Sequence, residues 1–203
     1  MEESLHLALS EMLTARLCHE LISPVGAIAN GVEILDEEPD FAADATRLIA
    51  DSTRSVSRRL QFYREAYGSR AGGTSRARAV TLDFFADSKI LCDWPETVDM
   101  GPPGVDKLAC NLMLLASEAL PRGGRLSLSI TPHGLPKVTG TGEGANVGSI
   151  AGLLEAPVVS IDQLTPRTSH GIFTRFLAER LALTIACQDT DRDEISLIVR
   201  PQA

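Results

Sequence analysis

Apolar residues recur at steps of three, four or seven positions through the first part of the chain. This spacing places them on one side of a helix, so it predicts an amphipathic helix over residues 5–35 that packs against a partner. The segment DEEPD, residues 36–40, interrupts the period with a proline, and the period then resumes from Phe41 to Tyr67 before Gly68 ends it. The first stripe consists of Leu9, Leu13, Leu17, Leu21, Pro24, Ile28 and Leu35.

Two helices joined by so short a turn form an antiparallel hairpin of about 40 Å, at about 1.5 Å per residue. Such a hairpin buries little core of its own, so it packs either on the rest of the chain or on a second copy. The length of the stripe favours the second arrangement, in which a homodimer forms a four-helix bundle.

The pattern changes after the hairpin. Residues 68–78, GSRAGGTSRAR, are rich in Gly, Ser and Arg and lack a period, which indicates a linker. We therefore predict a hairpin domain at 1–68, a linker at 69–80 and a second domain at 81–203. This mixture of elements predicts an α+β protein in which an α/β sandwich follows the hairpin. In the sandwich we expect helices at 82–91, 106–120 and 171–183, and strands at 125–130, 137–141 and 194–200.

Composition narrows the classes of function. The 203 residues are 44% hydrophobic, yet no apolar run is long enough to span a membrane, and the acidic start lacks a basic secretory leader. We expect a cytoplasmic protein without a membrane partner. The net charge of −8 argues against nucleic-acid binding as the main task. The four cysteines are widely spaced and no histidine lies at ligand spacing from them, so neither a zinc site nor a disulfide framework is indicated.

The charge is uneven along the hairpin. Residues 1–39 contain eight acidic residues and one arginine, a net of −7, whereas residues 40–80 contain eight arginines and four acidic residues, a net of +4. The two segments can attract each other across the helix pair. Alternatively, the basic segment can bind an acidic or phosphorylated partner.

His19 is the candidate for chemistry on the first helix. It points away from the apolar stripe, since it lies two residues, or about 200°, from both Leu17 and Leu21. Glu20 can orient the imidazole and make it a better nucleophile. Pro24 removes the amide that would bond to the carbonyl of Glu20 and bends the helix. An ordinary kink that helps a bundle to pack remains the alternative.

The run His19-Glu20-Leu21-Ile22-Ser23-Pro24 resembles the H-box, H-[D/E]-x-x-x-P, of histidine kinases. With CHELISPVGAIANGVEIL, FYREAYG, DW and NLMLLASEALPRGG, the chain is similar to the ChpT-type histidine phosphotransferases of alphaproteobacteria. The resemblance implies that His19 takes a phosphoryl group from the receiver domain of a hybrid histidine kinase and passes it to response regulators that control the cell cycle. It also implies that Mg²⁺ is brought by the receiver and that this chain binds no stable cofactor.

The second domain resembles the ATP-binding sandwich of the kinases but departs from its motifs. Leu115 stands where the N-box has its metal-binding asparagine, Gly140 stands where the adenine-binding aspartate is expected, and one glycine, Gly171, remains of the second glycine box. TGTGEG at 139–144 is more typical of a turn beside a strand than of a phosphate loop. We expect a degenerate nucleotide site, with an active histidine kinase or a non-catalytic dimeric scaffold as the alternatives.

The hairpin also predicts the surroundings of His19. A turn centred near residue 38 places His19 level with about Ser57, between Arg54 and Arg58. With Arg16 and Ser23, these arginines are predicted to contact the receiver, or else to pair with Glu20 or the other protomer. His170 is expected to cap a helix or to lie at the surface.

Overall fold

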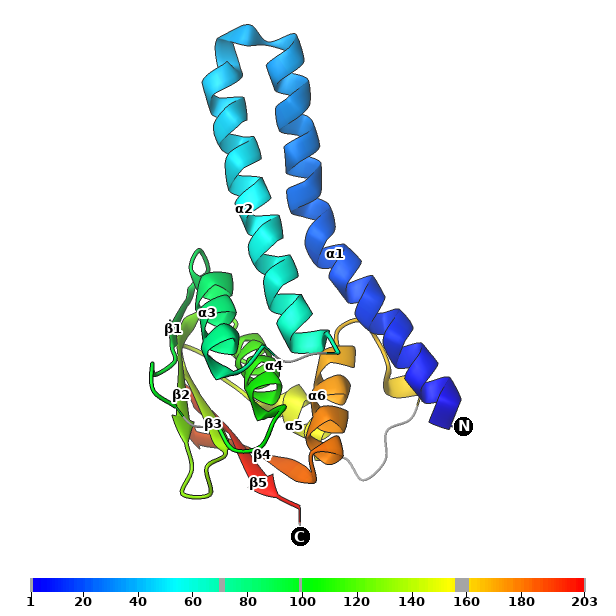
Figure 1. Cartoon of the computed structure of the whole chain (residues 1–203), viewed down its shortest axis with the longest axis vertical. Coiled ribbons are helices and arrows are strands. Elements are labelled where there is room, and N and C mark those ends of the chain that lie inside the picture. The colour runs from blue at the N-terminus through cyan, green and yellow to red at the C-terminus, as the bar shows by residue number, and fades with distance from the viewer. Residues whose placement is uncertain (1, 70–71, 99, 156–160, 203) are drawn as a thin grey trace.

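The structure, a computed structural model, describes residues 2–69, 72–98, 100–155 and 161–202. Its N-terminal part is a helical arm: helix α1 (Glu2–Glu37), a short 3₁₀ turn, η1 (Pro39–Phe41), and helix α2 (Ala42–Tyr67). Figure 1 shows α1 and α2 side by side and antiparallel, as the hydrophobic period predicts. Pro39 explains the turn, because it begins η1 two residues after α1 ends and its ring cannot continue a helix.

The two arm helices approach closely near the tip. A Cβ atom on Gly31 of α1 would lie 2.7 Å from Cγ1 of Ile49 in α2, so only glycine leaves room for the neighbouring side chain. Ala45, which faces the same contact from α2, is 2% exposed. Small residues therefore set the spacing of the hairpin at this level.

The rest of the chain forms a two-layer sandwich of five strands and several helices. The strands are β1 (Ile90–Asp93), β2 (Gly124–Ile130), β3 (Pro136–Thr141), β4 (Leu183–Asp191) and β5 (Glu194–Pro201). The helical elements are α3 (Thr74–Phe85), α4 (Val105–Glu118), α5 (Gly148–Leu154), η2 (Ile161–Gln163) and α6 (Ser169–Arg180).

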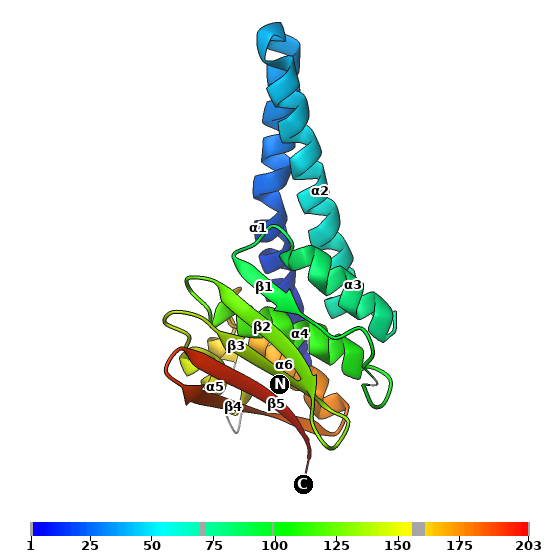
Figure 2. The same cartoon turned by 90° about the vertical axis from the view of Figure 1, so that its left-hand side faces the viewer.

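The sheet has the order β1-β2-β3-β5-β4, with β1 parallel to β2 and the remaining neighbours antiparallel. Its helices cover one face only, and Figure 2 shows the sheet in front of α4 and α6. Helix α4 is the centre of the core, since every residue from Val105 to Ala116 is buried. An α+β fold with a mixed sheet is thus confirmed.

The arm is rooted in the core of the sandwich. Phe62, Tyr63 and Ala66, near the end of α2, belong to the same hydrophobic cluster as α4 and the sheet. The ring of Phe62 stacks on Phe84 of α3 with 4.3 Å between centroids. The base of the arm is therefore stabilised by burial against α3 and α4, whereas the tip extends away from them (Figure 1).

Several elements differ from the prediction. The helix expected at 82–91 is α3, which begins at Thr74, inside the expected linker. Glu65 of α2 accepts hydrogen bonds from the amide of Gly72 and from Nε of Arg76, and these bonds join α2 to the start of α3. Strand β4 was missed because its second half alternates poorly and is exposed. Helix α6 ends at Arg180, earlier than expected. Two residues later, Ala182 has a positive φ of 55°, a conformation that usually falls on glycine, so the sequence does not mark this helix end. Strand β1 and helix α5 were also missed.

No helix in the described ranges is both long enough and apolar enough to cross a membrane.

Candidate functional site

His19 lies on the side of α1, and its side chain is exposed, as predicted. Pro24 stands inside the same helix, which continues through it to Glu37. Figure 1 shows that α1 changes direction partway along its length, so that its N-terminal part leans away from α2. A proline in a helix interior removes one backbone hydrogen bond and favours such a bend.

A cavity of about 570 Å³ opens between α1 and α2 beside the imidazole. Helix α1 contributes His19, Glu20, Ser23 and Pro24 to its wall, in agreement with the sequence motif. Helix α2 supplies the opposite wall, which is mainly polar and consists of Asp51, Ser52, Ser55 and Arg59. The motif therefore lines one continuous hollow, large enough to admit the side chains of a docking protein.

The acid beside the histidine is held across the hairpin. Nη1 of Arg59 donates a hydrogen bond to Oε2 of Glu20 over 2.5 Å. Both side chains are about one-third exposed, so the pair is partly screened from water. Tyr63 lies nearby, and burial together with the negative charge of Glu20 raises the pKa of its phenol to about 12, which keeps it neutral. Arg59 is thus a cation on the wall of the cavity that His19 faces, a position suited to a phosphoryl group.

A second cavity, of about 460 Å³, lies on the other side of His19, between the arm and the sandwich. Its wall contains Arg16 and Glu20 from α1, Glu118 from the end of α4, and Arg167. Arg16 pairs with Glu118 and so joins the arm to the sandwich one turn before the histidine. Burial raises the pKa of Glu118 despite the opposing effect of Arg16. Burial is the largest single effect on Arg16 and would lower its pKa, but the charge and hydrogen bond of Glu118, together with Tyr67 and Tyr63, outweigh it, so the pKa of Arg16 is raised.

The predicted site residues are thus only partly brought together. Ser23 and Arg16 lie in the two cavities beside His19. Arg54 pairs with Asp51 on its own helix, and Arg58 pairs with Asp83 in α3 and with Asp87 just after it. Neither lines the hollow, because positions on α2 turn by about 100° per residue and Arg59, not Arg58, faces α1. Pairing residues of the two helices by their distance from the turn gave the correct height of His19 along α2. It did not give the side of α2 that faces α1, so Arg59 was missed.

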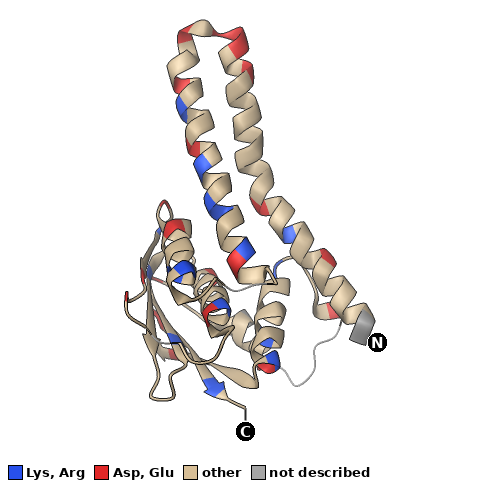
Figure 3. Cartoon of the chain, viewed as in Figure 1, with Lys and Arg blue, Asp and Glu red and all other residues tan. Residues whose placement is uncertain are grey.

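Opposite charges meet across the hairpin, in agreement with the interpretation that the acidic and basic segments attract each other. Basic residues follow one another along α2 in Figure 3, whereas α1 is mainly acidic and has Arg16 as its one basic residue. Glu20 of α1 and Arg59 of α2 form such a pair.

The positions that correspond to nucleotide motifs are used for packing. Leu115 is 1% exposed, and a Cβ on Gly140 of β3 would lie 3.1 Å from Ile195. The amide of Asn111 donates hydrogen bonds to the carbonyls of Ala66 and Lys107. Asn111, which begins the run that resembles the N-box, is therefore bonded to the base of the arm and to its own helix.

His170 is fully buried, so the expectation of a capping or surface role was wrong. Its Nε2 lies 3.1 Å from the carbonyl oxygen of Asn111, which can only accept, so Nε2 carries the proton. Nδ1 then accepts a hydrogen bond from the hydroxyl of Tyr67 over 2.8 Å. Burial, reinforced by the positive charge of Arg16, lowers the pKa of His170 to about 3. Neutral His170 thus joins α6 and α4 to the end of α2. Because these residues are far apart in the sequence, no local pattern predicts this contact.

Within the described part of the chain, no three His, Cys, Asp or Glu side chains are grouped closely enough to hold a metal ion.

Comparison with known proteins identifies relatives of this architecture. The profile of the histidine phosphotransferase C-terminal domain matches residues 74–193. The protein phosphotransferase ChpT of Brucella abortus (strain 2308) is 39% identical over 129 residues, which are 61% of this chain and 61% of that protein. A solved structure of a bacterial phosphotransferase, at 1.7 Å, aligns with a TM-score of 0.77 and 29% identity over 96% of both chains.

Proposed function

This chain belongs to the histidine phosphotransferase family, and from that membership we propose that it relays a phosphoryl group through a phosphohistidine at His19. The observation that carries the proposal is the exposed imidazole between two cavities, beside the Glu20–Arg59 pair. An imidazole so placed can reach the active site of another protein, which a buried histidine cannot.

The transfer needs little chemistry from this chain. A nitrogen of His19 attacks the phosphorus of an aspartyl phosphate in the donor receiver; the N–P bond forms as the acyl P–O bond breaks and the aspartate leaves as a carboxylate. The second transfer reverses these events with the aspartate of another receiver. Each receiver supplies its own Mg²⁺ and lysine, so this chain positions the nucleophile and supplies charge. In this scheme Arg59 orients Glu20 and stabilises the phosphoryl oxygens.

We further propose that the chain has no ATP-dependent kinase activity and that its sandwich is a degenerate ATPase-like domain. Asn111 is bonded to the arm, Leu115 is in the core, and Gly140 has no space for a carboxylate. His170, which precedes the remaining glycine of the second box, is bonded to Tyr67. These contacts support a domain retained to hold the arm and to dock partners.

A homodimer is supported by a second apolar stripe on α1, which the sequence interpretation overlooked. Ile22, Val25 and Val32 are 71%, 50% and 53% exposed. They follow one another at steps of three and seven, so they share a face, and that face points away from α2. We propose that this stripe packs on its counterpart in a second copy to form a four-helix bundle, with residues 1–68 as the dimerisation and phosphotransfer domain and 81–203 as the second domain.

The proposed partners are the receiver domain of a hybrid histidine kinase and the receivers of response regulators, including regulators of the cell cycle. These partners are cytoplasmic, so we propose the same compartment for this chain. Ser23, Arg16, Arg54 and Arg58 stay as predicted partner contacts; Arg54 is exposed on α2, whereas Arg16 and Arg58 are half-buried in their ion pairs.

The decisive experiment follows phosphate incorporation into the full chain from two sources. One reaction contains Mg²⁺-ATP alone, and the other contains a receiver domain phosphorylated beforehand. His19→Ala is the test variant and His133→Ala the control, because His133 lies in a turn of the sandwich, far from the arm in sequence. We expect acid-labile label from the receiver only, lost in His19→Ala and kept in His133→Ala.

Two other results would redirect the assignment. Label acquired from ATP alone would identify a histidine kinase. If no receiver labels the chain, yet His19→Ala still binds phosphorylated and unphosphorylated receivers as tightly as the parent, the chain is a scaffold. Both outcomes contradict the relay.

A further inference from the structure

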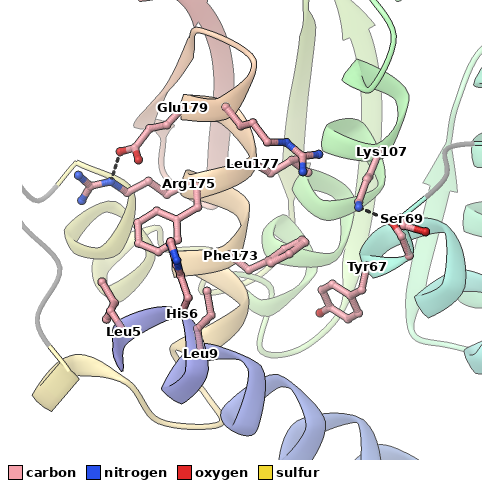
Figure 4. Close-up of a pocket in the computed structure, with 13 residues that line it drawn as sticks. Leu5, His6, Leu9, Tyr67, Ser69, Lys107, Phe173, Arg175, Leu177 and Glu179 are labelled. Carbon is pink, nitrogen blue, oxygen red and sulfur yellow. Dashed lines mark hydrogen bonds and ion pairs between the residues drawn. The ribbon is translucent and has the colours of Figure 1, made fainter. Parts of the chain in front are cut away.

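A cavity of about 750 Å³ lies at the lower end of the arm, away from His19. It is bordered by the first turns of α1, the end of α2, the start of α4 and the part of α6 from Phe173 to Arg180 (Figure 4). Its volume falls within the range of about 300–1,000 Å³ that is typical of small-molecule sites. None of the residues discussed for phosphotransfer lines it.

Most of the wall is apolar. Helix α1 contributes Leu5 and Leu9, and α6 contributes Phe173, Phe176 and Leu177. Leu9 and Leu177 are 5% and 4% exposed, so they are fixed in place by their neighbours. Aromatic and aliphatic side chains on facing helices can hold an apolar body on two sides.

Two cations lie at one end of this apolar space. The ammonium of Lys107 donates to the carbonyl of Gly68 over 2.5 Å and lies 5.7 Å from the centroid of the Phe173 ring. Arg180 is exposed and makes no ion pair with any described residue. Burial, together with the charge of Arg180, lowers the pKa of Lys107, so the two groups are close enough to repel each other.

The other charged groups on the wall offset each other. Nε of Arg175 donates to Oε1 of Glu179 over 2.7 Å (Figure 4). Glu65 and Asp106, which do not line the cavity, partly offset the charge of Lys107, whereas Arg180 has no ion-pair partner among the described residues. On the cavity wall itself, Lys107 and Arg180 are thus the cations without a facing carboxylate. An anion placed between them would relieve their repulsion.

We propose that this cavity binds a small amphipathic anion, whose apolar body lies between α1 and α6 and whose single carboxylate or phosphate head meets Lys107 and Arg180. The apolar wall selects against free inorganic anions, and the two cations select against neutral lipids. This combination matches an acyl-chain or aromatic acid better than a nucleotide, which would bring several charges and polar base edges.

The cavity is not the position at which the kinase resemblance would place ATP. Lys107 is in the first turn of α4 and Arg180 is the last residue of α6. The degenerate motifs lie at the opposite ends of these helices, at Leu115 in α4 and at Gly171 in α6. The inference is therefore independent of the proposed loss of nucleotide binding.

The test is isothermal titration calorimetry of the full chain with decanoate below its micellar concentration. We expect saturable binding of one decanoate per chain, weaker binding of decanol and no binding of inorganic phosphate. 1-Naphthoate serves as the aromatic acid, so the two titrations decide between an acyl and an aromatic body. Equal affinity for decanoate and decanol, or no saturation with either acid, overturns the proposal.

Variants locate the site. Arg180→Gln removes the charge of an exposed side chain and should weaken decanoate binding by about tenfold, whereas Arg192→Gln, in the β4–β5 turn, should not.

Leu5→Trp fills the cavity and should abolish binding. Leu7→Trp is its control, because Leu7 is 64% exposed and does not line the wall. Circular dichroism verifies that each variant is folded, and unchanged binding in both Arg180→Gln and Leu5→Trp contradicts the assignment.

Discussion

Oε2 of Glu20 in α1 lies 2.5 Å from Nη1 of Arg59 in α2. The acid next to the histidine is therefore held by the opposite helix, and the arginine that holds it lies in the same cavity as the imidazole. If the pair orients the site and contributes positive charge there, its loss must slow the chemical step more than it weakens docking.

Replacing Arg59 with glutamine should lower the rate of phosphotransfer by about 100-fold, the lower end of the effect of losing one preorganised donor to developing charge. Single-turnover transfer at a saturating concentration of phosphorylated receiver measures this rate without the contribution of binding. Arg47→Gln is the matched control, since Arg47 faces Asp44 near the tip of the arm. Equal rates for the two variants would exclude Arg59 from the step.

The Arg16–Glu118 pair predicts an asymmetry between its two partners. Arg16→Met leaves the Glu118 carboxylate buried without its cation and should lower the free energy of unfolding by about 1–3 kcal/mol. Glu118→Gln should lower it less. Burial raises the pKa of Glu118, so the stability that its neutral form provides is lost as the pH rises through that pKa. At pH 7 a glutamine avoids the free-energy cost of burying the ionised carboxylate.

Urea unfolding of both variants and of the double variant at pH 7 measures these differences and the coupling between the two side chains. Larger destabilisation by Glu118→Gln than by Arg16→Met would contradict the expectation.

His170 predicts a dependence of stability on pH. Its pKa is lowered from 6.5 to about 3 in the folded chain, so the unfolded chain binds the extra proton between these values. Stability due to neutral His170 is thus complete above pH 6.5 and falls by up to about 1.4 kcal/mol per pH unit below it.

The measurement compares urea unfolding at pH 7.5, 6.0 and 5.0 in the parent and in His170→Gln. The variant should be less stable at pH 7.5, because the contact with Tyr67 is altered, but its stability should change less on acidification. Parallel pH profiles would show that His170 does not titrate between the two states.

The exposed stripe on α1 predicts how the proposed dimer can be broken. Val25→Glu combined with Val32→Glu places two like charges on each copy at the proposed contact, so the chain should become monomeric. Multi-angle light scattering at micromolar concentration gives the mass, with Leu91→Glu as the control because Leu91 is 63% exposed on β1, away from the arm. A parent chain that is already monomeric would remove the bundle from the proposal.

Local patterns were sufficient for the parts of this chain whose structure depends on neighbours in sequence. The period of apolar residues predicted the hairpin, and alternation predicted β2. Strands β3 and β5 were also expected, and the offset of His19 from the stripe predicted its exposure. The family followed from the motif around His19 and from the segments that resemble its relatives.

The contacts that complete the site join residues far apart in the chain, and periodicity carries no information about them. Arg59 faces Glu20 because of the rotation of one helix against the other, and His170 is buried because α6 meets the end of α2. The cavity of Lys107 and Arg180 exists only where four helices meet. Sequence thus determined the proposed nucleophile and the elements that carry it, whereas packing between distant segments decided which charged groups surround it and that Leu115, a position of the N-box resemblance, lies in the core.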